Sequence, residues 1–147
     1  MKRAFTLLEL LIVISIIAIL AAAMIPNFIG FDAEARVATT QTNLNTLRTR
    51  VTLFRAKENR YPETLEELLT TTYSDMGVER PYLDQVPSEM ISSTSGNYNV
   101  ENVKSSEGLT GSGGWVYLQD KAKVVVNVTE LLPSRWGSYA DQKPSDW

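Results

Sequence analysis

Apolar side chains fill the first part of the chain almost without interruption and then thin out to regularly spaced positions. The run from Phe5 to Ile25 carries one acid, Glu9, near its start, and after this acid only Ser15 is polar. At a rise of about 1.5 Å per residue, a helix over this run spans roughly 30 Å, the thickness of the hydrocarbon core of a bilayer. The pattern therefore predicts a membrane-spanning helix over residues 5–26.

Beyond this run, apolar positions recur at helical spacing as far as residue 58. The last four are separated by three, four and three residues, which places them on one face of a helix. We predict an amphipathic stem helix over residues 27–58 whose apolar face packs on the rest of the protein. Pro26 and Gly30 are expected to kink or loosen the junction between the two helices, and the repeat is too short for a coiled coil. The recurring apolar residues are Ala35, Ala38, Leu44, Leu47, Val51 and Phe54.

The remaining residues, 59–147, predict a small globular head. Thr64 to Glu67 has the Thr-x-x-Glu pattern of a capping box and predicts a short helix with its leucines inward. From Thr70 to Gly96 the chain lacks periodicity and is rich in turn-forming residues, which predicts a long loop. Three apolar stretches then predict strands, and the polar tail from Leu131 to Trp147 has no predicted element. The predicted strands cover residues 97–103, 115–118 and 123–128.

These elements together predict an α+β fold. A long N-terminal helix packs on a head that has a short helix and about three antiparallel strands. A chain of 147 residues with a long apolar anchor has room for only one small domain of this kind.

Composition argues against the common kinds of enzyme. The chain has no cysteine and no histidine, which removes disulfides, thiolate nucleophiles, Ser-His triads and most zinc sites. The glycine-rich segment 108–114 lacks the lysine of a phosphate loop and does not open a helix. Glu66 and Glu67 are adjacent on a helix and point apart, so they do not form an acid–base pair. We expect no enzymatic activity and no cofactor.

Charge is divided unevenly along the chain. Residues 1–60 hold eight basic and four acidic side chains, whereas residues 61–147 hold six basic and thirteen acidic ones. Because nucleic acids are bound by basic surfaces, the acidic head argues against a nucleic-acid partner. Lys2 and Arg3 precede the apolar run, and acids follow it, so the N-terminus is expected in the cytoplasm and the head on the other side of the membrane.

The N-terminal segment KRAFTLLELLIVISIIAILAAAMIP resembles the N-terminus of type IV pilins and type II secretion pseudopilins. The resemblance implies that a prepilin peptidase removes residues 1–4 by cutting between Ala4 and Phe5, and that the new amine of Phe5 is methylated. It also implies that Glu9, together with Thr6 and Pro26, supports assembly into a helical filament. Ala4 stands where the family nearly always has glycine.

Parts of the head are similar to the major pseudopilin type. They are the segments NRYP at 59–62, LEEL at 65–68, YLDQVP at 82–87 and GGWVY at 113–117. The resemblance implies a pilin-like fold and a structural role. Its implied partners are copies of the same chain, related minor pilins or pseudopilins, the prepilin peptidase and an inner-membrane assembly platform. The implied location is the inner membrane, with the head in the periplasm, and after assembly a periplasmic or extracellular filament.

Major pseudopilins bind calcium in a C-terminal loop, and in this chain the candidate ligands are Asp141 and Asp146. Both supply the oxygen ligands that calcium prefers. No closely spaced group of acids accompanies them, and acids in a polar tail are commonly just solvated.

The chemistry of Glu9 supports an assembly role independently of the resemblance. Cleavage before Phe5 leaves a cationic amine one helical turn from an anionic side chain. In a bundle of such helices, the amine of one copy can pair with Glu9 of a neighbour. Because an unpaired charge is strongly unfavourable in a low dielectric, pairing favours one axial register.

Three other interpretations stay open. The apolar run is compatible with a secretory signal peptide that ends at Ala21–Ala23, although an acid within the run is unusual there. The chain is also compatible with a type IV pilin of a surface fibre used in adhesion or motility. We favour a pseudopilin because surface pilins often close their C-terminal loop with a disulfide. The third alternative is a monomeric, membrane-anchored binding module.

Overall fold

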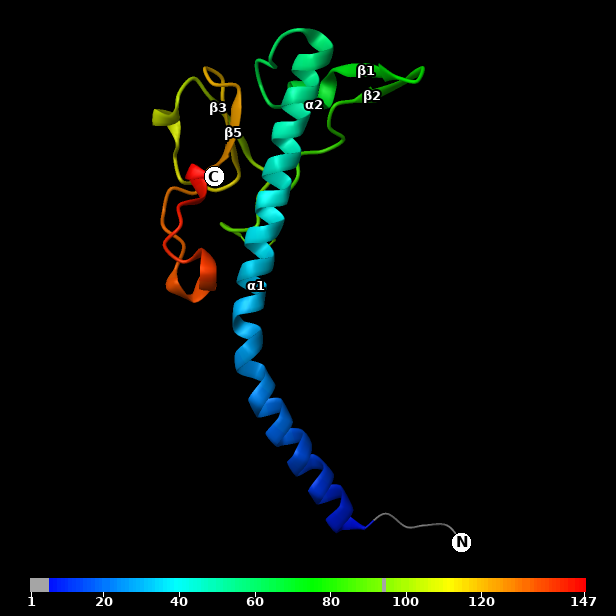
Figure 1. Cartoon of the computed structure of the whole chain (residues 1–147), viewed down its shortest axis with the longest axis vertical. Helices are drawn as coiled ribbons and strands as arrows, with labels where there is room; N and C mark the ends of the chain where they lie inside the picture. Colours follow the sequence, from blue (N-terminus) through cyan, green and yellow to red (C-terminus); the bar gives the residue numbers. More distant parts are fainter. Residues whose placement is uncertain (1–5, 94) are drawn as a thin grey trace.

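The computed structural model describes residues 6–93 and 95–147, with the side chains of residues 25–30, 106 and 135 left out. One long helix carries a small head on its second half, and its first half extends away from the head (Figure 1). The head contains a two-stranded hairpin and a three-stranded sheet. The elements are α1 (Leu7–Glu58), α2 (Glu67–Thr70), β1 (Thr72–Asp75), β2 (Val78–Pro81), β3 (Val100–Val103), η1 (Ser106–Gly108), β4 (Trp115–Leu118), β5 (Lys123–Val126), η2 (Ser134–Tyr139) and η3 (Pro144–Asp146).

The helix α1 is continuous over 52 residues. It passes through Pro26 and Gly30 without a break and bends gradually along its length in Figure 1. A proline removes one intrahelical hydrogen bond, which a long helix tolerates when the rest of its hydrogen bonds remain. The helix ends at Glu58. Its C-cap, Asn59, still donates its N–H to the carbonyl of Arg55 at 3.0 Å, and its left-handed backbone (φ 58°) then turns the chain out of the helix. The membrane-spanning part and the stem are therefore one element.

One face of the stem is buried under the head. Its positions alternate steps of four and three residues, as expected for a single helical face. The prediction is confirmed for the part from Leu44 to Phe54, but it is wrong for Ala35 and Ala38, which are exposed. Ala35 lies nine residues before Leu44, which is two and a half turns, and so it faces the opposite side. The buried positions are Ala33, Val37, Thr40, Leu44, Leu47, Val51 and Phe54.

The three-stranded sheet has β4 at its centre. The strands β4 and β5 pair in antiparallel fashion around the turn at 119–122, as predicted. The pair β3–β4 is parallel, so the expectation of antiparallel pairing among the predicted strands is wrong for this edge and is confirmed for β4–β5. The difference arises because the link 104–114 carries the chain back to the start of β3 before β4 begins. The α+β, pilin-like fold class is confirmed.

Both faces of β4 are buried, because its side chains alternate between two apolar clusters. Trp115 and Tyr117 pack with Phe54 and the other apolar residues of the stem. Val116 and Leu118 pack in a second cluster with Val125 and with two partly buried side chains, Val103 of β3 and Leu109 of the link. The strand therefore ties the stem helix to the far side of the head.

Two glycines let the chain enter β4. Gly113 and Gly114 have positive φ angles of 85° and 76°, which residues other than glycine rarely adopt. A Cβ atom at Gly114 would lie 2.4 Å from the carbonyl oxygen of Asn99, and the Gly114 N–H donates to the buried carboxylate of Glu89 at 3.1 Å. The loop before β3 is thereby held against the start of β4.

The segment predicted as a long loop contains a β-hairpin. β1 and β2 pair over four positions around a two-residue turn, Met76-Gly77. The hairpin was missed because neither strand has a buried face, and so the sequence shows no alternation of apolar and polar residues. Its base is fixed by Tyr73, whose ring lies 4.7 Å from that of Tyr82, which is fully buried.

The predicted capping box at residues 64–67 is also wrong. The N-cap of α2 is Glu66, and its side chain makes no capping hydrogen bond. The carboxylate of Glu67 instead accepts from the Glu63 N–H at 2.8 Å and forms an ion pair with Arg60. The inward leucines are confirmed for Leu65 and Leu68, which are fully buried.

The tail is ordered along the stem. Leu132 and Trp136 pack with Ala33 and Val37 of α1. Further along, Arg48 donates to the backbone oxygens of Val124 at 3.0 Å and Trp147 at 2.5 Å. These contacts were not predicted, because they join segments about 100 residues apart in the sequence.

We predict that the head loses stability in alkali through Tyr117. Burial raises the pKa of its hydroxyl to about 12, and the neutral hydroxyl donates to the Pro62 carbonyl at 2.8 Å. A folded-state pKa above the unfolded value of about 10 gives stability that is complete below pH 10 and is lost as the pH rises through about 12. Tryptophan fluorescence during denaturation of the full chain in detergent micelles should show this loss.

Tyr117→Phe is the matched variant. It should cost about 1 kcal/mol at neutral pH through the lost hydrogen bond and should make the free energy of unfolding fall less steeply between pH 10 and pH 12. An unchanged slope would show that Tyr117 does not titrate with unfolding.

Candidate assembly surface of the N-terminal helix

The first half of α1 is apolar and uncovered. The segment Leu7–Met24 has a mean hydropathy of 2.8, and none of it is buried within the chain. By length and composition it is able to cross a membrane. A core helix of a soluble protein passes the same test of composition but is covered by its own fold, whereas this segment is not. Its apolar surface therefore needs lipid or other protein chains around it.

A capping box closes the start of this helix. Thr6 is the N-cap, and its hydroxyl oxygen accepts from the Glu9 N–H at 3.2 Å. In return, Oε2 of Glu9 accepts from the Thr6 N–H at 3.0 Å and from the Thr6 hydroxyl at 2.9 Å. Two backbone donors that have no partner within the helix are satisfied in this way.

The box sets the position of the only charge on the apolar surface of Leu7–Met24. Glu9 is the single ionisable residue between Leu7 and Met24, and its bonds to Thr6 hold its carboxylate beside the first turn. The other polar side chain, Ser15, donates to the carbonyl of Leu11 at 2.7 Å and is satisfied within the helix. The helix therefore carries one anion, held in place near its N-terminal end.

The predicted site residues do not all meet. Thr6 and Glu9 are joined directly, whereas Ala4 and Phe5 lie outside the described residues. Pro26 lies seventeen residues beyond Glu9, about 25 Å along the helix, so its predicted assembly role is not part of the same site.

The sequence contained a signal for the capping box that our prediction did not use. Thr6-Leu7-Leu8-Glu9 has the same Thr-x-x-Glu spacing that we assigned to residues 64–67. At the N-terminus this pattern forms the box, and in the head it does not. The difference is that Thr6 precedes a long helix, whereas the four-residue helix in the head starts only at Glu67.

The candidate calcium ligands Asp141 and Asp146 are exposed. Asp146 accepts from the neighbouring Ser145 hydroxyl at 3.4 Å. Within residues 6–93 and 95–147, no three acidic, histidine or cysteine side chains come together as a metal site.

Two family models match the chain. The prokaryotic N-terminal methylation motif matches residues 1–25, and type II secretion system protein G matches residues 27–99. The chain is 46% identical over 67 residues to the type IV major pilin PilA of Myxococcus xanthus. It is 33% identical over 67 residues to the type II secretion system core protein G of Pectobacterium carotovorum, and 33% identical over 72 residues to that of Klebsiella michiganensis.

These alignments cover 46% or 47% of this chain and 30%, 43% and 51% of the respective relatives, so the chain spans less than two thirds of their length. No solved structure matches the chain.

We predict that Thr6→Ala opens the first turn of α1. Loss of the N-cap hydroxyl leaves the Glu9 N–H without its acceptor, and an N-cap of this kind contributes about 1 kcal/mol. Hydrogen exchange of the Glu9 amide, measured by NMR on the full chain in micelles, should be about fivefold faster. Thr6→Ser keeps the hydroxyl and should exchange like the wild type. Equal rates in all three proteins would contradict the capping role.

Proposed function

We propose, because the chain belongs to the family of type IV pilins and type II secretion pseudopilins, that it is the structural subunit of a pilus-like filament and acts as a type II secretion pseudopilin. The observation that carries the proposal is the uncovered apolar half of α1, which bears one anion near its end and is continuous with the stem of the head. Such a helix can anchor the subunit in a membrane before assembly and can pack among identical helices in a filament.

Before assembly, the chain is anchored by this helix. The basic residues Lys2 and Arg3 keep the N-terminus in the cytoplasm, and the head lies in the periplasm. A prepilin peptidase cuts between Ala4 and Phe5 on the cytoplasmic side, and Phe5 is then methylated on its new amine. Alanine at position 4 is small, as the glycine usual in the family is.

During assembly, the amine of Phe5 in an incoming copy pairs with Glu9 of a copy already in place. The pair forms among apolar side chains, where a lone charge is unfavourable, so it selects one register over others. Thr6 assists by holding the Glu9 carboxylate at the level of the first turn. Pro26 contributes by allowing the helix to bend where the membrane part meets the stem.

The proposed partners are other copies of this chain, related minor pilins or pseudopilins, the peptidase and an inner-membrane assembly platform. The role is structural and needs no catalytic group. Calcium binding at Asp141 and Asp146 stays a proposal, and backbone carbonyls of the tail would have to complete the ligand set.

A surface pilus is the second candidate. It is favoured by the identity with the Myxococcus type IV pilin, which is 46%, compared with 33% for the secretion proteins. Deletion of the chain separates the two functions, since a pseudopilin is needed for release of secreted proteins, whereas a surface pilin is needed for fibres that can be sheared from cells.

We predict that coproduction with a prepilin peptidase makes Phe5 the N-terminus. Intact-mass and N-terminal sequencing should show loss of residues 1–4 and one added methyl group. Ala4→Gly should be cut at least as fast, and Ala4→Leu, whose side chain is much larger, should stay uncut. A chain that keeps Met1 in the presence of an active peptidase would exclude processing.

We also predict that Glu9→Val abolishes filaments while the subunit stays in the membrane. The substitution leaves the amine of an incoming copy without an anion. Electron microscopy of sheared fibres and membrane fractionation measure the two outcomes. Ser15→Val, which also replaces a polar side chain of the apolar segment by valine about 1.7 turns further along, is the control and should assemble. Normal filaments from the Glu9 variant would refute the register mechanism.

A further inference from the structure

The β1–β2 hairpin projects from the head into solvent (Figure 1). Six of its eight strand residues are exposed, all except Tyr73 and Pro81. Its tip residue Met76 is fully exposed, at 101%. Val78, next to the tip, is 52% exposed. A two-stranded hairpin without a covered face is only marginally stable in water, so this projection is suited to contact with another surface.

The identity of the tip residue supports a contact. Met76 has a left-handed backbone (φ 49°), and Gly77 follows with φ 84°. The first position of such a turn favours asparagine, aspartate or glycine. Neither turn formation nor burial within the chain accounts for a methionine here. Methionine is, however, a side chain that adapts well to irregular apolar pockets.

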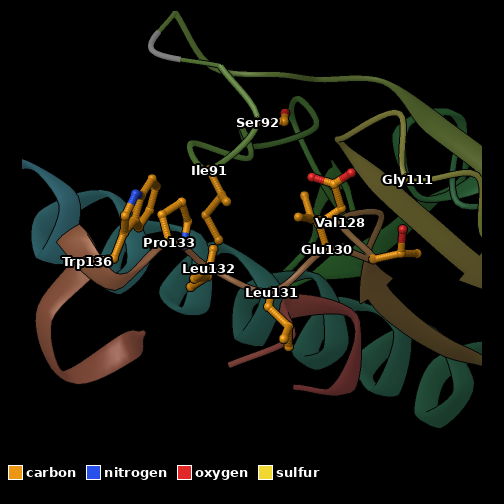
Figure 2. Close-up of a pocket in the computed structure, with 10 residues that line it drawn as sticks. Ile91, Ser92, Gly111, Val128, Glu130, Leu131, Leu132, Pro133 and Trp136 are labelled. Carbon is orange, nitrogen blue, oxygen red and sulfur yellow. The ribbon is translucent and has the colours of Figure 1, made fainter. Parts of the chain in front are cut away.

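A pocket of about 260 Å³ lies elsewhere on the head, between the loop at Ile91 and the tail. Figure 2 shows Ile91 beside Leu132 and Pro133, with Trp136 toward one end and Glu130 toward the other. Cavities of about 150 Å³ accept benzene. This pocket, whose lining also includes the polar residues Ser92, Thr129 and Glu130, is larger and has room for an unbranched methionine side chain.

The tip and the pocket lie at different levels of the same stem. The pocket residue Trp136 packs with Val37, whereas the base of the hairpin packs through Tyr82 on Phe54. These two stem positions are seventeen residues apart, about 25 Å along α1. A contact between tip and pocket therefore joins two copies, and it uses different surfaces on each. Contacts of this kind do not close on themselves and build open filaments.

The two surfaces offer one pair of opposite charges, Arg80 and Glu130, although the hairpin also carries the exposed acids Asp75 and Glu79. Arg80 on β2 is exposed and has only a loose ion pair with Asp75, at 3.9 Å, while Glu130 is an exposed acid on the pocket wall. We propose that the tip of the β1–β2 hairpin, led by Met76, inserts into the Ile91–Trp136 pocket of a second copy in the filament, with Arg80 of the first copy facing Glu130 of the second. This inference rests on the proposed filament function.

Cysteine cross-linking tests the contact directly, because the chain has no cysteine of its own. Met76→Cys is combined with Leu131→Cys, a pocket residue that is 60% exposed, in cells that assemble filaments from the full chain. Oxidation or a short bifunctional thiol reagent should give a ladder of dimers, trimers and longer species. Each single variant should give dimers at most. The control pair is Met76→Cys with Tyr98→Cys, a residue of similar exposure (56%) outside the pocket, which should give no ladder.

Charge reversal gives a second readout in the same cross-linking background. Arg80→Glu and Glu130→Arg should each lower the yield of the ladder severalfold, and the two together should restore it. Met76→Asn, a better turn residue, should keep the head as stable to denaturation as the wild type while shortening the filaments.

Each remaining outcome decides between the proposals. Filaments that form normally but give no ladder would overturn the tip-in-pocket contact and leave the filament function standing. Cross-links from Met76→Cys to a different protein would overturn the second copy as occupant. Absence of filaments from the wild-type chain, with processing intact, would instead refute the proposed function.

Discussion

The structure depends on an apolar surface that its own chain does not cover. None of the eighteen residues Leu7–Met24 of α1 is buried by the described chain, yet they continue directly into a stem that has one face buried under the head. The first half of the helix is therefore an apolar segment that water does not solvate well, and the second half supplies part of the core of the head. Because the two halves are one continuous helix, the packing of the first half limits where the head can lie.

The capping box gives this surface its single polar feature. A carboxylate in an apolar environment is strongly unfavourable unless donors surround it. The Thr6 backbone and hydroxyl supply two donors from within the chain. In the assembly mechanism that we propose, Glu9 therefore enters the membrane as a partly satisfied anion, and its remaining capacity to accept hydrogen bonds is available for a cation from another copy. Without the capping box, the Glu9 carboxylate would have neither of these donors before it met a cation.

Prediction from the sequence succeeded where the hydrophobic pattern is strong and local. The continuous apolar run, the helically spaced stripe from Leu44 to Phe54 and the short apolar stretches at 115–118 and 123–126 are such patterns, and the structure has an element at each of them. It failed where local residues carry no such signal. The hairpin is exposed on both faces, the parallel β3–β4 pairing depends on the path of a link, and the tail contacts the stem through residues about 100 positions apart in the sequence. The capping box was predictable but was assigned to the wrong Thr-x-x-Glu segment.

The two proposed contacts constrain one another because α1 is continuous. Pairing of the Phe5 amine with a neighbour's Glu9 shifts two parallel copies by four residues, about 6 Å along the helix. Insertion of the hairpin tip into the pocket requires a shift of about 25 Å, the distance between their levels on the stem. For helices parallel to the filament axis, the second shift is about four times the first. If each copy is shifted by about 6 Å along the filament axis from the one before it, the contact between Phe5 and Glu9 joins neighbouring copies in this series. The contact between hairpin tip and pocket then joins each copy to the fourth one above it. A filament in which both contacts form is held at its core and at its surface by different neighbours.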